Sequence, residues 1–273
     1  MELIERNPML EKMRRGEPVL GCQVRCRSPL VAELLGYCGL DYVFIEGEHF
    51  VHNIETVENQ IRAVQLSGAV PIVRLPSHED GLILQVLEAG VMGIIFPHID
   101  TKEQALHAIR EVKYSPVGNR GFGDGARASK FGFVPTEEYL EHVNRNVMVI
   151  GMIESQEGIR NLDEILSTGI DVLRVGAKDL SMDMGYGGVV TPEVRQAVEG
   201  ICKKVRDSNV ILGDAGLGGL GSQEDFETCC QLGCHMFTIG SDMAVLKQTV
   251  LGKKKTFDSL KKVHMEAKLA AKE

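Results

Sequence analysis

Side chains that can transfer protons, bind metal ions or stabilise negative charge follow the short apolar runs of this sequence. In chain order they are Glu46, Glu48, His49, Arg74, His98, Asp100, Glu154, Lys178, Asp179, Asp214 and Asp242. A single member such as Asp100 is explained as a helix N-cap or as a first-turn acid beside the helix dipole. Core packing does not explain why so many of these side chains follow the end of an apolar run. Together they indicate a reaction centre.

Two carboxylates of this set suit a hard divalent cation. Glu154 and Asp179 follow successive apolar runs, with no cysteine or second histidine beside them. Such oxygen ligands suit Mg²⁺, Mn²⁺ or Co²⁺ and leave positions open for substrate and water. Arg74 can stabilise a developing oxyanion, and His49 can move a proton at neutral pH. The pattern predicts a site that forms an enolate from a metal-chelating oxo-acid.

The apolar runs themselves predict the elements that hold these side chains. There are eight: Val19–Val24, Tyr42–Ile45, Val70–Leu75, Met92–Phe96, Val147–Ile153, Val172–Val175, Val210–Leu212 and Met236–Ile239. Most are apolar at nearly every position, which is typical of parallel strands covered on both faces. Eight such strands joined by crossover helices favour an α/β fold with a single (β/α)8 TIM barrel, whose chemistry lies at the carboxyl ends of the strands. A doubly wound open sheet is the alternative.

Segments with helical periodicity separate the predicted strands. They are Pro29–Cys38, Ile54–Leu66, Gly81–Ala89, Lys102–Glu111, Ile159–Leu166, Pro192–Asp207 and Ser222–Leu232. A glycine-rich stretch, Gly118–Gly132, and a further helix, Pro135–Asn144, widen the interval before the fifth strand, and we interpret this insertion as lying near the active face. No linker divides the chain, so we expect one domain over residues 1–273, with a helical lead-in (1–18) and a tail (247–273) that contains a Lys-rich helix, Phe257–Lys272.

The composition excludes several classes of partner. The 273 residues contain 30 Lys plus Arg against 38 Asp plus Glu, a net charge of −8, and 44% are hydrophobic. This acidic balance, with no basic run longer than Lys253–Lys255, argues against nucleic acid or an anionic membrane as partner. No apolar stretch reaches the roughly 20 residues that span a bilayer, Met1–Arg15 lacks a signal-peptide core, and the seven cysteines include no C-x-x-C pair. We expect a cytoplasmic protein with reduced thiols that acts on small molecules.

Ordered motifs from about Gly21 to Leu246 resemble the HpcH/HpaI aldolase family. The matching segments are Tyr42–His49, Val73–Arg74, Leu87–Gly90, Arg120–Gly123, Ala126–Ser129, Ile153–Glu154, Asn161–Ile165, Val175–Gly176 and Asp179–Ser181. The resemblance implies a metal-dependent (class II) aldolase that cleaves a 4-hydroxy-2-oxo acid to pyruvate and an aldehyde. It also implies a TIM barrel whose last helix is exchanged between subunits, in homo-oligomers that are commonly hexamers built from dimers.

The resemblance assigns roles to individual residues. Glu154 and Asp179 match the ligands of a divalent metal cofactor, Mg²⁺, Mn²⁺ or Co²⁺, and Arg74 matches the arginine that stabilises the enolate. His49 matches the histidine of proton transfer, with Glu46 as its acidic partner. The substrate is expected to contact Arg74, Met152, Ala177, Lys178 and Asp179.

Four positions depart from the family pattern. Glu46 and Glu88 stand where the aldolases usually carry Asp, Met152 stands where they carry Gln, and Lys178 replaces a small residue. These changes alter the polarity of the pocket, so the aldehyde is not transferred from the family. Decarboxylation of oxaloacetate, or another carbon–carbon lyase or synthase reaction of the same enolate, is the alternative activity.

Three rival functions follow from other features. Lys178 suggests a Schiff-base mechanism, although the adjacent Asp179 would stabilise its ammonium. Gly216–Gly221 matches the G-x-G-x-x-G pattern of dinucleotide sites, with Asp242 at a suitable distance, but only one strand remains after it, which favours a substrate-covering loop. A non-catalytic scaffold is disfavoured because both predicted metal carboxylates are present.

Overall fold

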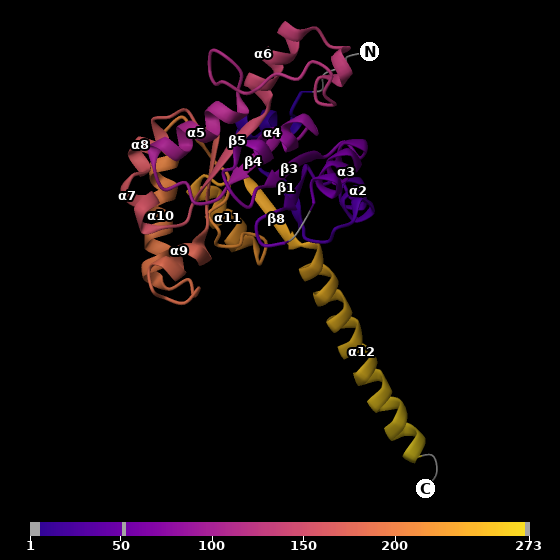
Figure 1. The fold of residues 1–273 in the computed structure, drawn as a ribbon. Helices are drawn as coiled ribbons and strands as arrows, with labels where there is room; N and C mark the ends of the chain where they lie inside the picture. The colour runs from indigo at the N-terminus through magenta and orange to yellow at the C-terminus, as the bar shows by residue number, and fades with distance from the viewer. Residues whose placement is uncertain (1–5, 51–52, 271–273) are drawn as a thin grey trace.

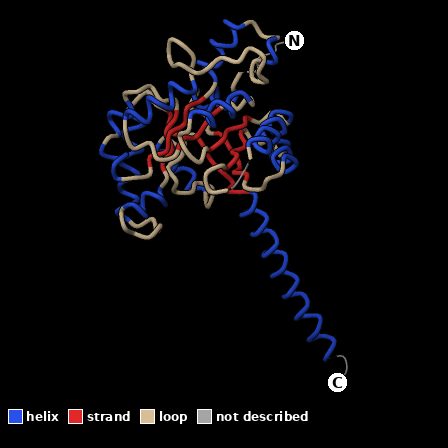
Figure 2. The backbone as a smooth tube through the Cα atoms, viewed as in Figure 1, coloured by secondary structure: helices blue, strands red, loops and turns tan. Residues whose placement is uncertain are grey.

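Eight parallel strands form one closed sheet in the computed structural model, which describes residues 6–50 and 53–270. They are β1 (Val19–Val24), β2 (Tyr42–Glu46), β3 (Val70–Arg74), β4 (Gly93–Phe96), β5 (Met148–Ile153), β6 (Val172–Val175), β7 (Ile211–Leu212) and β8 (Met236–Ser241). From β1 to β7 each strand pairs with the next one in sequence, and β8 pairs with β1. The backbone N–H of His235 donates to the carbonyl oxygen of Leu212 (3.0 Å), and that of Met236 to Gly213 (2.6 Å), joining β7 to β8. The predicted TIM barrel is confirmed (Figures 1 and 2).

The side chains of each strand alternate between the barrel interior and the surrounding helices. On β2, Tyr42 and Phe44 belong to the interior cluster, whereas Val43 and Ile45 pack outward. All five positions of β2 and of β3 are buried, because helices cover the outer face. The same alternation turns Glu46 and Arg74 inward at the carboxyl ends of their strands. This places two charged groups inside the mouth of the barrel.

The predicted helices are present with small shifts in their bounds. The helices that follow β1 to β4 are α2 (Pro29–Tyr37), α3 (Ile54–Leu66), α4 (Asp80–Glu88) and α5 (Lys102–Val112), and those after β5 to β7 are α7 (Gln156–Arg160), α8 (Leu162–Leu166), α9 (Ala177–Asp183), α10 (Pro192–Arg206) and α11 (Gln223–Leu232). The single helix expected over Ile159–Leu166 is therefore two short ones. The lead-in contains α1 (Pro8–Arg14), whose Met9, Leu10 and Met13 join the interior cluster at the amino end of the barrel.

The glycine-rich insertion lies at the amino end of the barrel, so its expected place near the active face is wrong. The backbone N–H of Ala128 donates to the carbonyl oxygen of Glu88 at the end of α4 (3.1 Å). Lys113 Nζ donates to the carbonyl oxygen of Val147, directly before β5 (2.6 Å). The physical reason is the direction of the chain: α5 has already returned it to the amino end, where residues 113–135 and α6 (Thr136–Asn146) are inserted.

The last helix, α12 (Asp242–Ala270), projects away from the barrel (Figure 1). It begins directly after β8, which is earlier than the expected start at Phe257, while Lys272 lies outside the described residues. Its apolar residues Leu246, Val250, Phe257 and Leu260 are exposed. No helix within the described residues is both long and apolar enough to span a bilayer.

Candidate active site

A buried arginine–glutamate pair lies at the mouth of the barrel, where β2 and β3 end side by side. Arg74 Nε lies 3.1 Å from both carboxylate oxygens of Glu46, and Nη2 lies 2.5 Å from Oε2. Gln23 on β1 donates to the same carboxylate, and the backbone N–H groups of Glu48 (2.9 Å) and His49 (3.3 Å) also donate to it. Burial opposes the charge of Glu46, but these hydrogen bonds and Arg74 outweigh it and lower the pKa of the carboxyl group. The pair holds the guanidinium in one orientation.

Glu48 links Arg74 to two histidines. Its Oε2 lies 2.8 Å from Arg74 Nη1 and 3.4 Å from His49 Nε2, and its Oε1 lies 3.7 Å from His98 Nε2. The imidazole of His49 is 58% exposed. Its acidic neighbour is therefore Glu48, whereas the expected partner Glu46 contacts only the backbone N–H of His49. Residue type alone did not distinguish these two glutamates.

Glu154 is a buried carboxylate on the opposite side of the same mouth. Its side chain is 2% exposed, and its Oε1 accepts the backbone N–H of His98 (2.7 Å) with His98 Nδ1 at 3.4 Å. His98 has a φ of 51°, and this turn directs its N–H at the carboxylate. A Cβ on Gly176 would come 2.5 Å from Glu154 Oε2, so the following strand end has room only for glycine.

The first turn of α9 carries the other residues expected at the site. Ala177 is buried, whereas Lys178 and Asp179 are exposed. Burial raises the pKa of Glu154, and the negative charges of Asp179 and Glu48 raise it further, against the opposing effect of His98. A buried carboxylate that faces two other acids suits an added cation, and its oxygens are the ligands that Mg²⁺ and Mn²⁺ prefer. Glu154 and Asp179 thus fit a divalent metal ion, and their role as ligands stays a prediction.

Met152 and Phe44 border the guanidinium of Arg74. Met152 Sδ lies 3.6 Å from Arg74 Nη1. The ring of Phe44 lies 5.7 Å from the guanidinium carbon of Arg74 and 5.3 Å from that of Arg174. Arg174, on β6, pairs with Asp214 at 2.9 Å. These contacts limit the movement of Arg74 from the side that faces the barrel interior.

Lys178 and the glycine-rich loop after β7 were the features behind two rival functions. Lys178 is exposed, whereas the lysines that form Schiff bases are activated in apolar pockets or beside a second cation. In the loop, a Cβ on Gly216 would come 2.6 Å from the carbonyl oxygen of Val175, so close packing accounts for this glycine. Neither geometry favours the rival function.

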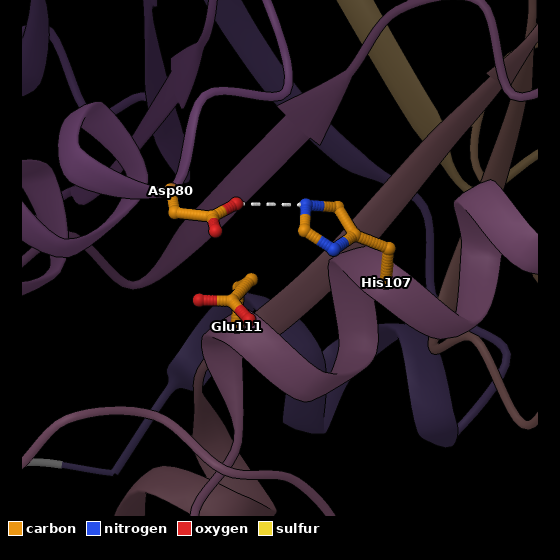
Figure 3. A group of neighbouring side chains, drawn as sticks. All are labelled: Asp80, His107 and Glu111. Atoms are coloured by element: carbon orange, nitrogen blue, oxygen red, sulfur yellow. Dashed lines mark ion pairs between the residues drawn. The ribbon is translucent and has the colours of Figure 1, made fainter.

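A second cluster of metal-ligating types lies on the outer helices, where the sequence analysis named no site. Asp80, His107 and Glu111 have ligand atoms within 4.8 Å of one another (Figure 3). Asp80 begins α4, and His107 and Glu111 are four residues apart on α5. This spacing places two ligand-type side chains on one face of a helix, and it is the feature of the sequence that indicates the cluster. Asp80 is 67% exposed and its carboxylate already pairs with His107 Nε2 at 3.0 Å. This cluster is a second candidate position for a metal ion, besides the barrel carboxylates.

Removing the Glu46 side chain is expected to destabilise the protein strongly. In Glu46→Ala, Arg74 would remain buried with Glu48 as its remaining carboxylate partner, and breaking a buried ion pair costs up to about 3–5 kcal/mol. Urea denaturation of the variant and the parent measures this loss. Glu17→Ala is the control, because Glu17 and Arg15 form an exposed pair that is expected to contribute less than about 1 kcal/mol. Equal losses in the two variants would contradict the prediction.

The closed barrel and its polar carboxyl rim define a TIM-barrel enzyme. The chain belongs to the HpcH/HpaI aldolase/citrate lyase family, whose sequence profile matches residues 20–248. The 5-keto-4-deoxy-D-glucarate aldolase of Salmonella arizonae is 32% identical over 245 residues, which cover 89% of this chain and 92% of that protein.

Two solved structures are also similar. A family protein from Burkholderia cenocepacia J2315 has a TM-score of 0.84 at 28% identity, covering 92% of this chain and 99% of its own. The citrate synthase SbnG has a TM-score of 0.82 at 28% identity, covering 92% and 97%. The family predicted from the sequence is confirmed, and the chain is a carbon–carbon lyase.

Proposed function

We propose that this enzyme catalyses the reversible retro-aldol cleavage of a 4-hydroxy-2-oxo acid to pyruvate and an aldehyde. The substrate in the name of the Salmonella relative supports this class. In 5-keto-4-deoxy-D-glucarate a keto group adjoins a carboxyl group, and a methylene and a hydroxyl-bearing carbon follow. Numbered from that carboxyl group, the molecule is a 4-hydroxy-2-oxo acid.

The orientation of Arg74 is the observation that carries the proposal. Its Nε and Nη2 are held by Glu46, and Nη1 lies at the mouth of the barrel between Glu48 and Met152. A fixed guanidinium at this point stabilises an oxyanion as it develops, without reorganising during the reaction. Enolate formation from a 2-oxo acid generates such an oxyanion at C2.

The proton transfers are assigned to the exposed imidazole at the rim. Cleavage removes the proton of the 4-hydroxyl group, breaks the C3–C4 bond, and leaves the bonding electrons in the enolate of pyruvate. His49, with Glu48 beside it, is suited to take up that proton and to return one to C3. Arg74 stabilises the enolate oxygen between these two events. The aldehyde leaves with the carbon that carried the hydroxyl group.

A divalent metal ion is part of this proposal, with Glu154 and Asp179 as the residues that would hold it. When bound, such an ion orients the 2-oxo acid and draws electron density from its carbonyl group. Burial of Glu154 and its nearness to Asp179 and Glu48 support this assignment. Mg²⁺, Mn²⁺ and Co²⁺ all suit the oxygen ligands. Ala177, Lys178 and Met152 remain the proposed neighbours of the substrate.

A second candidate activity uses the same enolate with another carbon–carbon bond. Decarboxylation of oxaloacetate, or condensation of an enolate with a different carbonyl compound, needs the same arginine and metal ligands. The similarity to a citrate synthase at 28% identity supports this second candidate. Met152 beside Arg74 also makes this side of the pocket less polar than the glutamine of the family pattern would.

Deuterium exchange into the methyl group of pyruvate tests the enolate directly. The enzyme is expected to catalyse exchange only with added Mg²⁺, Mn²⁺ or Co²⁺, and a screen of aldehydes and oxaloacetate then identifies the carbon–carbon bond. Exchange without any aldol product would reject the aldolase and keep the enolate site, whereas absence of exchange would reject both. Borohydride trapping with pyruvate is the control, because an adduct on Lys178 would establish the Schiff-base route.

We also propose that the enzyme is a homo-oligomer in which α12 packs on a second copy. In a TIM barrel the eighth helix fills the groove between the first and seventh helices. Here α12 projects away from the barrel, and Leu30, Leu34 and Tyr37 of α2, the first helix after β1, are exposed. These residues recur at helical spacing, as do the exposed apolar residues of α12. A hexamer built from such dimers is the proposed assembly.

Light scattering after size-exclusion chromatography tests the helix exchange. Phe257→Asp puts a charge into the apolar face of α12, so the variant is expected to run as a smaller species than the parent. Lys255→Asp lies two residues away on the opposite side of the helix and is expected to keep the parental mass. An unchanged mass for Phe257→Asp would contradict the exchange.

A further inference from the structure

A cavity of about 250 Å³ lies at the amino end of the barrel, away from the candidate active site. Its floor is apolar and includes Val70, Met92 and Val147, which begin or directly precede β3, β4 and β5. Arg74, at the other end of β3, is four residues from Val70, which corresponds to about 13 Å along a strand. The cavity is therefore separate from the mouth of the barrel.

The polar wall of this cavity is cationic. Arg6, Arg120, Arg127 and Lys130 line it, and no Asp or Glu is found among its described lining residues. Two nearby carboxylates already have partners, because Glu88 pairs with Arg120 and Glu58 with Arg62. Arg127 and Lys130 thus bring positive charge that the cavity itself does not balance.

Among the described residues, the hydrogen-bond partners of Arg127 are neutral groups. Its Nη1 donates to the carbonyl oxygen of Ala89 (2.6 Å), and its Nη2 donates to Oε1 of Gln65 (2.7 Å). Burial and the charge of Arg62 lower the pKa of Arg127, and the charge of Glu58 opposes this only in part. A Cβ on Gly90 would come 2.9 Å from Arg127 Nη1, so the glycine leaves space for the guanidinium. The charge is fixed but not neutralised.

Two further groups on the wall have unused hydrogen-bond donors. Arg120 is 1% exposed and its Nε has no hydrogen-bond partner in the described structure, although its Nη2 contacts Glu88 (2.9 Å) and Tyr139 (3.1 Å). His142 is neutral at pH 7, because burial and then Lys130 lower its pKa to about 4. Its Nδ1 lies 3.2 Å from the amide nitrogen of Asn146. With Nδ1 accepting, Nε2 carries the proton and can donate.

We propose that this cavity binds a small organic anion, whose carboxylate or phosphate group is held by Arg127, Lys130 and His142. Its apolar part would lie on the floor formed by Val70, Met92 and Val147. Uncompensated cations, free donors and an apolar floor in one enclosure match such an amphipathic anion. The volume limits the ligand to roughly the size of a substituted benzene ring or smaller. The site requires none of the residues of the proposed reaction.

Isothermal titration calorimetry of the full-length enzyme with three probes tests the proposal. Benzoate carries a carboxylate, phenyl phosphate carries a phosphate, and benzamide has a similar shape without a charge. At least one anion is expected to bind tenfold or more tightly than benzamide, and the better of the two identifies the preferred head group. If neither anion binds more tightly than benzamide, the proposal is wrong.

Charge-removing variants locate the binding. Arg127→Gln and Lys130→Gln are each expected to weaken the anion by about tenfold, because a hydrogen bond to a charged group is lost. Lys203→Gln, on the exposed face of α10, is the control and is expected to bind like the parent. Lys130→Gln locates the site even if Arg127→Gln fails to fold, since Lys130 Nζ donates no hydrogen bond within residues 6–50 and 53–270. Anion binding that both variants retain and Arg74→Lys loses would assign the anion to the barrel mouth and overturn the proposal.

Discussion

Arg74→Lys is expected to lower kcat by about 10²–10³-fold. Loss of one fixed donor to a developing oxyanion has a cost of this size, and an ammonium does not reproduce the planar guanidinium fork. In the parent, that fork bonds to both oxygens of Glu46 while Nη1 remains beside Glu48 and Met152. The single ammonium group of lysine can pair with the carboxylate of Glu46 or contact the substrate, but it cannot do both as the guanidinium does. Steady-state kinetics and pyruvate deuterium exchange both measure the effect.

The lysine substitution separates chemistry from folding. It keeps a positive charge opposite the buried Glu46, so the urea midpoint is expected to fall much less than in Glu46→Ala. Arg160→Lys, at an exposed position on α7, is the matched control and is expected to leave both kcat and stability unchanged. Near-normal turnover of Arg74→Lys would make Arg74 only the structural partner of Glu46.

Glu154→Gln is expected to abolish metal-dependent activity, with a loss of about 10³-fold or more. The charge stabilisation that a catalytic metal ion supplies is worth several kcal/mol, and an amide oxygen is a much weaker ligand than a carboxylate. The amide keeps an acceptor for the N–H of His98 and removes a charge that burial disfavours. Without metal, the Glu154→Gln variant is therefore expected to be at least as stable as the parent. Activity titrated with Mn²⁺, together with thermal unfolding after chelation, measures both effects.

The cluster of Asp80, His107 and Glu111 provides the control for this experiment. His107→Gln and Glu111→Gln remove ligand-type groups from the outer helices and leave the barrel mouth intact. They are expected to leave metal-dependent turnover unchanged, even if they reduce the total metal bound. The opposite pattern, with turnover lost in these two variants and kept in Glu154→Gln, would move the metal site to the outer helices.

The strands and the residues at their carboxyl ends were predictable because both depend on local sequence. Near-continuous apolar runs followed by Glu46, Arg74 and Glu154 define a strand and its last side chains without any knowledge of the partner strands. The resemblance then supplied the family, which the profile match confirmed. The same reasoning failed for the ends of two helical segments. The helix expected over Ile159–Leu166 is two short helices, and the last helix extends over Asp242–Ala270. These ends depend on tertiary packing and not on the period of apolar residues.

The arrangement of charges at the rim was not predictable in this way. Glu46 and Glu48 are two residues apart and of one type, yet the first is buried beneath Arg74 and the second faces His49 and His98. Which glutamate lies buried beneath the arginine depends on where β2 ends relative to β3. The pairing register sets that point, aligning Glu46 with Arg74.

The sequence by itself determined that this protein is an eight-stranded barrel with an acidic, arginine-containing rim, because the period of apolar residues and the types that follow each run are local properties of the chain. Only the tertiary structure decided which end of the barrel the insertion covers, which glutamate is buried beneath Arg74, and that Arg127 and Lys130 share a cavity with residues from three strand starts. The physical reason is that these contacts join segments far apart in sequence. Barrel closure and strand register bring them together, and no short window of residues encodes either.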